Sequence, residues 1–168
     1  VIQRHEIPVH YPMEHLAGFQ MDVENISYKS LGSTLNYCWR VAGVVGVMMS
    51  LVMGRRDGAT LDRTSELGMA FQLTNIARDV VEDAVINRVY LPSEWLQEEG
   101  IHSISHILDS NKRAALGRVA ARLVDTADPY YQSAGKGLVA LPLRSAWSVA
   151  TARGVYCHIG RRVKVRGE

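Results

Sequence analysis

Phe71-Gln-Leu-Thr-Asn-Ile-Ala-Arg-Asp-Val-Val-Glu-Asp83 is the stretch of this sequence that decides the fold and points to a function. On an α-helix, Asp79 and Asp83 are four residues apart and lie on one face, about one turn from each other. Gln72 and Asn75 continue this polar stripe toward the amino end. At roughly 100° per residue, the four side chains fall within an arc of about 80°. The remaining residues are mostly apolar, so we expect a largely buried helix with one polar stripe.

The polar stripe has two interpretations. Carboxylate and amide oxygens suit Mg²⁺ or Mn²⁺, and Mg²⁺ usually takes one or two carboxylates and completes its shell with water and substrate phosphate oxygens. The stripe therefore predicts a metal site, with a diphosphate substrate beside it. On spacing alone, two aspartates on a solvated face are the more common arrangement. The apolar residues around Asp79 and Asp83 favour the metal site, because an unpaired buried charge costs several kcal/mol.

Four segments carry a resemblance to a known family. Residues 67–84, followed by Asn87-Arg-Val-Tyr-Leu-Pro92, resemble the second aspartate-rich signature of the squalene/phytoene synthase family. Tyr37-Cys-Trp-Arg-Val-Ala-Gly-Val-Val-Gly-Val-Met-Met49 is similar to the family's other signature, and Leu141-Pro-Leu-Arg-Ser-Ala-Trp147 points to its bacterial phytoene synthase branch. The similarity covers essentially the whole chain. Asn87 stands where the family often has Gly, a departure that changes no metal ligand.

The resemblance implies an all-α fold, a partial isoprenoid-synthase helical bundle around a central cavity. It also implies the head-to-head condensation of two geranylgeranyl diphosphates to phytoene through prephytoene diphosphate, a reaction of carotenoid biosynthesis. The cofactor would be Mg²⁺ or Mn²⁺. The metal ligands would be Asp79, Asp83 and Asn75. The catalytic residues would be Tyr37, which handles protons, and Arg78, which contacts the diphosphate or pairs with Glu82. The substrate-binding residues would be Gln72, Asn75, Val41, Val45 and Tyr156.

The helix that begins near Tyr37 is rich in small residues. Gly43 and Gly46 allow close approach of either a second helix or a prenyl chain, and helix packing alone would explain them. Tyr37 can hydrogen-bond a diphosphate oxygen, or act with that diphosphate as a base toward a carbocation. By residue type, a tyrosine that reaches from the core toward solvent is an equally good interpretation. The resemblance favours the active-site role.

Three alternatives to a phytoene synthase stay open. A squalene or dehydrosqualene synthase would use farnesyl diphosphate, and the squalene enzyme would end with hydride transfer from NADPH. A non-catalytic helical assembly protein of the same fold would be expected to have lost its aspartates, and this chain keeps both. A generic helical interaction module would need no metal.

Composition agrees with one helical domain. The chain has 168 residues, 47% hydrophobic content and a formal net charge of +2, which does not indicate a nucleic-acid partner. Cys38 and Cys157 lie in apolar contexts, so we expect reduced core cysteines in a cytoplasmic protein.

The apolar run from Val41 to Met53 is expected to be a buried helix, too short to cross a bilayer. Peripheral contact with the inner face of a membrane is compatible with a hydrocarbon substrate and product.

Helix signals divide the chain into segments with short joints between them. The expected helices are Pro12 to about Met21, Gly32 to Gly54, about Ala59 to Ile86, Pro92 to Gly100, Asn111 to Asp125, and Pro142 toward Val163. Asp128 and Pro129 predict either a new helix start or a kink within a longer helix.

The family's first aspartate-rich motif is missing from this sequence. Asp22 with Glu24, and Asp125 with Asp128, do not resemble it in context. We therefore expect residues 1–168 to be an internal fragment that carries the second metal motif and does not turn over substrate alone.

A basic cluster lies near the end of the sequence. Arg161, Arg162, Lys164 and Arg166 could attract anionic lipid or diphosphate. Cations in the last turn of a helix also interact favourably with the helix dipole, and this is the favoured interpretation.

Overall fold

The computed structural model describes residues 1–167, and every regular element in that part of the chain is helical, which confirms the predicted all-α class. The elements in chain order are α1 (His10–Val23), α2 (Leu31–Cys38), the π-helix η1 (Trp39–Gly43), α3 (Val44–Val52), α4 (Gly58–Arg78), α5 (Val80–Val85), α6 (Ser93–Glu98), α7 (Ile104–Leu108), the 3₁₀-helix η2 (Ser110–Lys112), α8 (Arg113–Gly137), the 3₁₀-helix η3 (Leu138–Ala140) and α9 (Leu143–Gly167).

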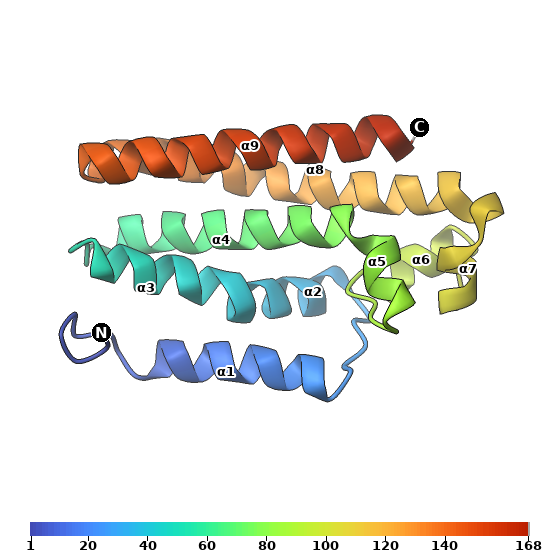
Figure 1. Ribbon diagram of the computed structural model, residues 1–168, viewed down its shortest axis with the longest axis horizontal. Helices are drawn as coiled ribbons and strands as arrows, with labels where there is room; N and C mark the ends of the chain where they lie inside the picture. The colour runs from blue at the N-terminus through green and yellow to red at the C-terminus, as the bar shows by residue number, and fades with distance from the viewer. Residues whose placement is uncertain (168) are drawn as a thin grey trace.

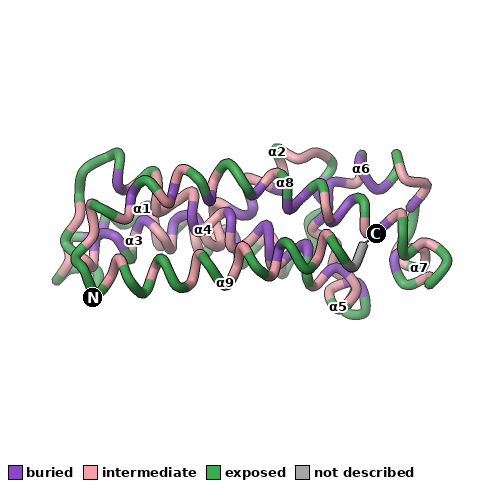
Figure 2. Tube along the Cα trace, turned by 90° about the horizontal axis from the view of Figure 1, so that it is seen from above, coloured by how far each residue is buried: buried purple, intermediate pink, exposed green. Residues whose placement is uncertain are grey.

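The long helices run roughly along one axis, with α4 at the centre (Figure 1). α4 packs against α8, α9, η1 and α3, while α1 lies on the outer side of η1 and α3. Short helices α5, α6 and α7 gather beyond the carboxyl end of α4 (Figure 1). Buried residues concentrate along α4 and its neighbours, whereas α9 is mostly exposed or half-buried (Figure 2).

Local signals set most helix boundaries. The Ser30 hydroxyl accepts a hydrogen bond from the Ser33 amide and forms a capping box at the start of α2. The Asp57 carboxylate caps α4 by accepting a hydrogen bond from the Thr60 amide at 3.0 Å. Gly100, at φ +68°, follows α6 in a left-handed conformation that costs glycine little. These starts and stops agree with the predicted segments.

Two predicted segments differ from the structure. The helix expected from Ala59 to Ile86 bends at Asp79, which has φ −101° and ψ 15° and separates α4 from α5. Asp79 and the two β-branched valines after it are poor helix formers, and this weakens the helix at that point. In contrast, α8 continues through Pro129, so the alternative of one longer helix was right and the new helix start was wrong.

The apolar helix is longer than its sequence suggested. α2, η1 and α3 form one helical stretch, Leu31–Val52, of 22 residues, which is long and apolar enough to cross a membrane by length and composition. The sequence interpretation counted only the run from Val41 to Met53 and judged it too short. Core helices of soluble proteins pass the same test, and this helix packs against α4 and α1.

Glycines allow this helix to touch α4. A Cβ on Gly46 would lie 2.0 Å from the Thr64 carbonyl oxygen, and a Cβ on Gly68 would lie 2.2 Å from the Ala42 carbonyl oxygen. Neither contact is sterically allowed, so both positions need glycine. Close helix packing therefore explains Gly46, one of the two glycines for which a prenyl contact was the alternative.

Candidate active site

The predicted carboxylates lie where α4 gives way to α5. The Asp79 amide donates to the Asn75 carbonyl oxygen at 2.9 Å, and the Asp83 amide donates to the Asp79 carbonyl oxygen at 2.8 Å. These bonds carry the helical spacing across the bend, so the two carboxylates stay near each other. Burial and then the Asp79 carboxylate raise the pKa of Asp83 to about 6, against the opposing effect of Arg88.

The donor set fits a hard divalent cation. Like-charged carboxylates repel in the absence of a cation, which is the cause of part of the Asp83 pKa shift. The buried Oδ1 of Asn75 has no hydrogen-bond partner among the described residues. A cation held by Asp79, Asp83 and this amide oxygen would satisfy both features. Within residues 1–167 no cluster of three or more histidine, cysteine, aspartate or glutamate side chains is close enough to hold a metal, so these residues would supply only part of its shell.

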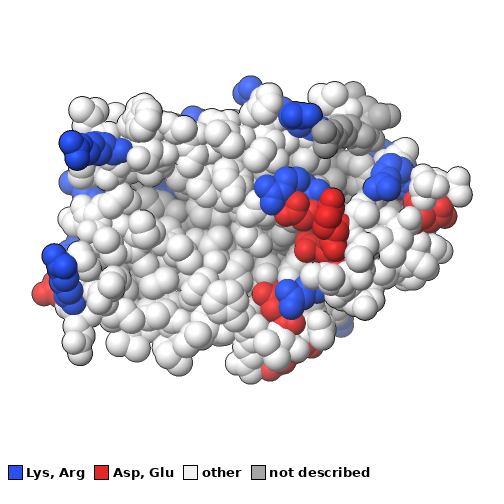
Figure 3. Space-filling view, viewed as in Figure 1, with Lys and Arg blue, Asp and Glu red and all other residues white. Residues whose placement is uncertain are grey.

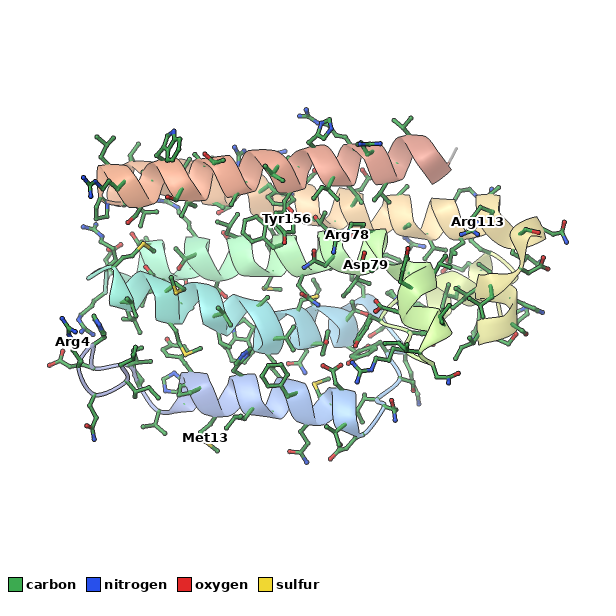
Figure 4. The ribbon with its side chains drawn as sticks, in the orientation of Figure 1. Arg4, Met13, Arg78, Asp79, Arg113 and Tyr156 are labelled. Carbon is green, nitrogen blue, oxygen red and sulfur yellow. The ribbon has the colours of Figure 1, made fainter. Side chains whose placement is uncertain are left out.

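Arg78 forms a two-point ion pair with its neighbour Asp79 (Figure 4). Nε and Nη2 donate to the two carboxylate oxygens at 2.6 and 2.5 Å. This hydrogen bonding is also the main cause of the raised pKa of Arg78. The sequence interpretation offered Glu82 or a phosphate as the partner of Arg78. The structure selects Asp79, so a phosphate contact would require this pair to open or to be shared.

An apolar groove of about 620 Å³ runs along α4, and Asn75 lies at one end of it. Its walls come from η1 and α3 on one side and from the amino-terminal half of α9 on the other. Val41, Val45, Gln72 and Asn75, all predicted to bind substrate, line it. In Figure 3 the same face of the molecule is largely free of charge, with acidic and basic side chains gathered near the end of α4. The groove can therefore take a long hydrocarbon whose polar end lies near Asn75.

Tyr156 reaches α4 from α9 at the end of this groove (Figure 4). Its ring packs against Phe71, with ring centroids 4.3 Å apart, and Phe71 is a lining residue of the groove. Tyr156 thus contacts a residue that lines the groove but does not line the groove itself, and its role in substrate binding stays a prediction.

Tyr37 occupies a separate cluster behind the groove wall. Its hydroxyl donates to both carboxylate oxygens of Asp22, at 3.0 and 3.1 Å, and the Tyr90 hydroxyl donates to Asp22 at 2.9 Å. The Tyr37 and Tyr90 rings stack with centroids 4.9 Å apart. Burial, then the neighbouring Tyr90 and Asp22, hold the pKa of Tyr37 well above its ordinary value. Tyr37 is therefore a protonated hydrogen-bond donor, and it is not among the residues that line the apolar groove.

Asp22 is the site residue that sequence reasoning missed. It was considered only as a substitute for an absent motif and then set aside. The structure places its carboxylate against Tyr37 and Tyr90, close enough that it contributes to the raised pKa of Asp83. Asp83 and Tyr90 also share a small cavity with Arg88. The sequence offers little sign of this contact, because Asp22 in α1 is far along the chain from Tyr37, Asp83 and Tyr90.

Asn87 lies in the turn between Asp83, at the predicted metal site, and Tyr90, which contacts Asp22. It has φ +60°, a left-handed conformation that glycine adopts freely and asparagine tolerates better than most residues. The following Arg88 amide donates to the Asp83 carbonyl oxygen at 2.9 Å. The departure from Gly at this position therefore preserves the turn.

Comparison with known proteins shows the family of this chain. The family model for squalene/phytoene synthase matches residues 1–168. The chain belongs to the squalene/phytoene synthase family. Among curated relatives, it is 57% identical over 167 residues to the 15-cis-phytoene synthase of Enterobacter agglomerans, covering 99% of this chain and 56% of that protein. It is 54% identical over 168 residues to the 15-cis-phytoene synthase of Pantoea ananas, covering 100% of this chain and 54% of that protein.

Solved structures of this family share the fold. The squalene synthase HpnC from Alicyclobacillus acidocaldarius matches with a TM-score of 0.85 at 17% identity, over 99% of this chain and 63% of that one. A dehydrosqualene synthase solved with a ligand matches with a TM-score of 0.80 at 25% identity, over 88% of this chain and 52% of that one. The chain thus spans about half the length of the curated squalene/phytoene synthase family members it matches.

Proposed function

We propose that the chain is the second-motif part of a phytoene synthase, which condenses two geranylgeranyl diphosphates head to head to phytoene through prephytoene diphosphate. The observation that carries this proposal is that Asn75, whose buried Oδ1 has no hydrogen-bond partner among the described residues, lines one end of an apolar groove, and that Asp79 and Asp83 follow it at helical spacing. The identity to named phytoene synthases supports the choice of reaction within the family.

The polar end of the groove would hold the diphosphate group. Asp79, Asp83 and Asn75 would bind Mg²⁺ or Mn²⁺, which when bound neutralises charge on the departing diphosphate. Arg78 lies beside Asp79 and can share its guanidinium with a phosphate oxygen, because its five donors are not all used by one carboxylate. These residues would lower the barrier to departure of the diphosphate and formation of an allylic cation.

The apolar groove would guide the hydrocarbon and keep water away from the cation. Val41 and Val45, which line the groove, offer no nucleophile to a cation. The second substrate's double bond would then attack the cation, and loss of a proton would close the ring of the cyclopropyl diphosphate intermediate. Ionisation of that intermediate releases its diphosphate, and rearrangement with loss of a second proton gives phytoene. Tyr37, protonated and bound to Asp22, would act as a fixed donor that positions this end of the site and not as the first proton acceptor.

The experiment uses the full-length protein with geranylgeranyl diphosphate and Mg²⁺. We expect Asp79→Ala and Asp83→Ala to abolish most phytoene formation and to weaken Mg²⁺ dependence. Asp62→Ala is the matched control, because Asp62 is an exposed aspartate on the same helix and lies outside the groove. Normal turnover in either site variant would refute the metal assignment.

A second candidate is a squalene or dehydrosqualene synthase that uses farnesyl diphosphate. The observation in its favour is that a solved dehydrosqualene synthase matches this chain at 25% identity. Product analysis with farnesyl and geranylgeranyl diphosphate, with and without NADPH, separates the two candidates. Phytoene formed from geranylgeranyl diphosphate without NADPH would support the first.

A further inference from the structure

A second groove, of about 550 Å³, lies between the end of α4, α5, the start of α8 and the last turns of α9. We call it the arginine groove, because Arg78, Arg113 and Arg162 line it. Glu82 is the only acidic side chain among its lining residues. The groove therefore carries more positive than negative charge, although the predicted metal site beside it is acidic.

Two of these arginines have no counter-ion. Arg78 is bound to Asp79, but Arg113 and Arg162 form no ion pair or side-chain hydrogen bond within residues 1–167. The other arginines of α8 behave differently. Arg118 and Arg122 each bind a glutamate at the end of α6, with closest N–O distances of 2.6 Å. Among the arginines of α8, the one that lines this groove is therefore the one without an ion pair among the described residues.

Helix stability does not explain both cations. Arg162 lies in the last two turns of α9, where a cation interacts favourably with the helix dipole, as its sequence position predicted. Arg113 is the first residue of α8, where the same dipole disfavours a cation, and the first turn contains no acidic residue. The side chain of Arg166, the last member of the predicted basic cluster, lies outside the described residues.

The groove also has apolar walls. Val80 and Val81 from α5, Leu116 from α8, and Ile159 and Val163 from α9 all line it. Such walls accept a short hydrocarbon but give a simple hydrated anion little to contact. The combination of arginine forks with aliphatic side chains suits a phosphorylated amphiphile.

The arginine groove follows the apolar groove along the same seam between α4 and α9. The apolar groove takes its α4 wall from residues 64–75, and the arginine groove begins at Ala77. Between them stand the Phe71–Tyr156 ring contact and the Arg78–Asp79 ion pair. A diphosphate at this boundary would have the carboxylates and their cation on one side and the guanidinium groups on the other.

We propose that Arg113 and Arg162 form an anion site that binds a diphosphate group, either that of a prenyl diphosphate or the inorganic diphosphate released from it. Each guanidinium can donate two parallel hydrogen bonds to phosphate oxygens. The choice of diphosphate rests on the proposed function, whereas recognition of the anion rests on the groove itself. The site works without a metal, unlike the one at Asp79 and Asp83.

The test measures binding of inorganic diphosphate to this chain by calorimetry in the presence of EDTA. The double variant Arg113→Gln/Arg162→Gln should bind about tenfold or more weakly, equivalent to about 1.4 kcal/mol. Arg4→Gln/Lys29→Gln is the matched control, since it removes the same charge from two exposed cations that have no ion-pair partner among the described residues. The control should stay within about twofold of the parent chain, and raised salt should weaken parent binding. Arg113→Lys/Arg162→Lys should recover part of the affinity.

Two results would overturn the proposal. Equal affinity in the groove variant and the parent chain would show that these arginines do not bind the anion. Equal weakening in the groove and control variants would show that only net charge matters. Circular dichroism of each variant confirms that the helices are intact.

A second arm uses geranylgeranyl diphosphate in place of inorganic diphosphate. Tighter, arginine-dependent binding of the prenyl compound would assign the groove to the substrate, and equal affinity would assign it to the released anion. The Mg²⁺-dependent binding that Asp79→Ala removes reports on the proposed function separately. Failure of one site therefore does not imply failure of the other.

Discussion

The apolar groove and the arginine groove share the α4–α9 seam, yet their walls carry different chemistry. In the apolar groove, glycines bring the helices close and valines face a largely uncharged space. In the arginine groove, beyond the Asp79 bend, charged side chains from α4, α5, α8 and α9 converge. The difference shows that the lining of one seam changes along its length, from mostly apolar side chains in the first groove to several charged side chains in the second.

The largest expected effect is at that boundary. Asp79→Ala in the full-length enzyme should lower turnover by roughly 10²–10³-fold, because a metal ligand is lost and several kcal/mol of charge stabilisation go with it. Metal-free diphosphate binding by the arginine groove should persist or strengthen, since Arg78 loses its carboxylate partner. Steady-state kinetics measures the turnover, and calorimetry measures the metal-free diphosphate binding. A parallel loss of both would show that the grooves are a single site.

Breaking the wall of the apolar groove should have the next largest effect. Gly68→Ala would place a Cβ 2.2 Å from the Ala42 carbonyl oxygen, so the helices must separate. We expect the free energy of unfolding to fall by about 2–3 kcal/mol. Urea denaturation measures it. Gly154→Ala is the control, because a Cβ there meets nothing within 4 Å, and it should be neutral or stabilise α9 by up to about 1 kcal/mol.

Removing the Phe71–Tyr156 ring contact between the two grooves should lower stability by a smaller amount. Tyr156→Ala deletes the ring that packs on Phe71 and should cost about 1–2 kcal/mol of unfolding free energy, since the tyrosine is only half-buried. Tyr156→Phe keeps the ring and should be close to the parent protein. If thermal melts show no difference between the Ala and Phe variants, the ring contact does not hold the seam together.

The smallest expected effect is a pH dependence from Asp83. Its pKa in the folded protein, about 6, lies above the ordinary value of 3.8, so between these values the folded state binds more protons than the unfolded state. Stability of the metal-free chain should therefore fall as pH rises from about 4 to about 6, by roughly 1 kcal/mol once solvent screening of this half-buried group is allowed for. Asp83→Asn should remove this contribution in urea titrations. A parent slope equal to that of the variant would contradict it.

Much of the fold could be predicted from the sequence because its signals are local. The Ser30 and Asp57 caps and the Gly100 stop act within a few residues, and the structure confirms the helix boundaries they set. The stripe of Gln72, Asn75 and Asp79 follows from helical periodicity alone. The bend at Asp79 was missed, because the i to i+4 bonds continue across it and the polar pattern shows no interruption.

The sequence by itself determined an all-helical chain, the stripe that ends in Asp83, and membership of the family that the comparisons then showed. Only the tertiary structure decided that Asp22 binds Tyr37, that Gly46 serves helix contact, and that Arg113 and Arg162 face one groove. The reason is physical. Propensity and periodicity act between near neighbours in the chain, whereas the faces that meet depend on how all the helices pack together.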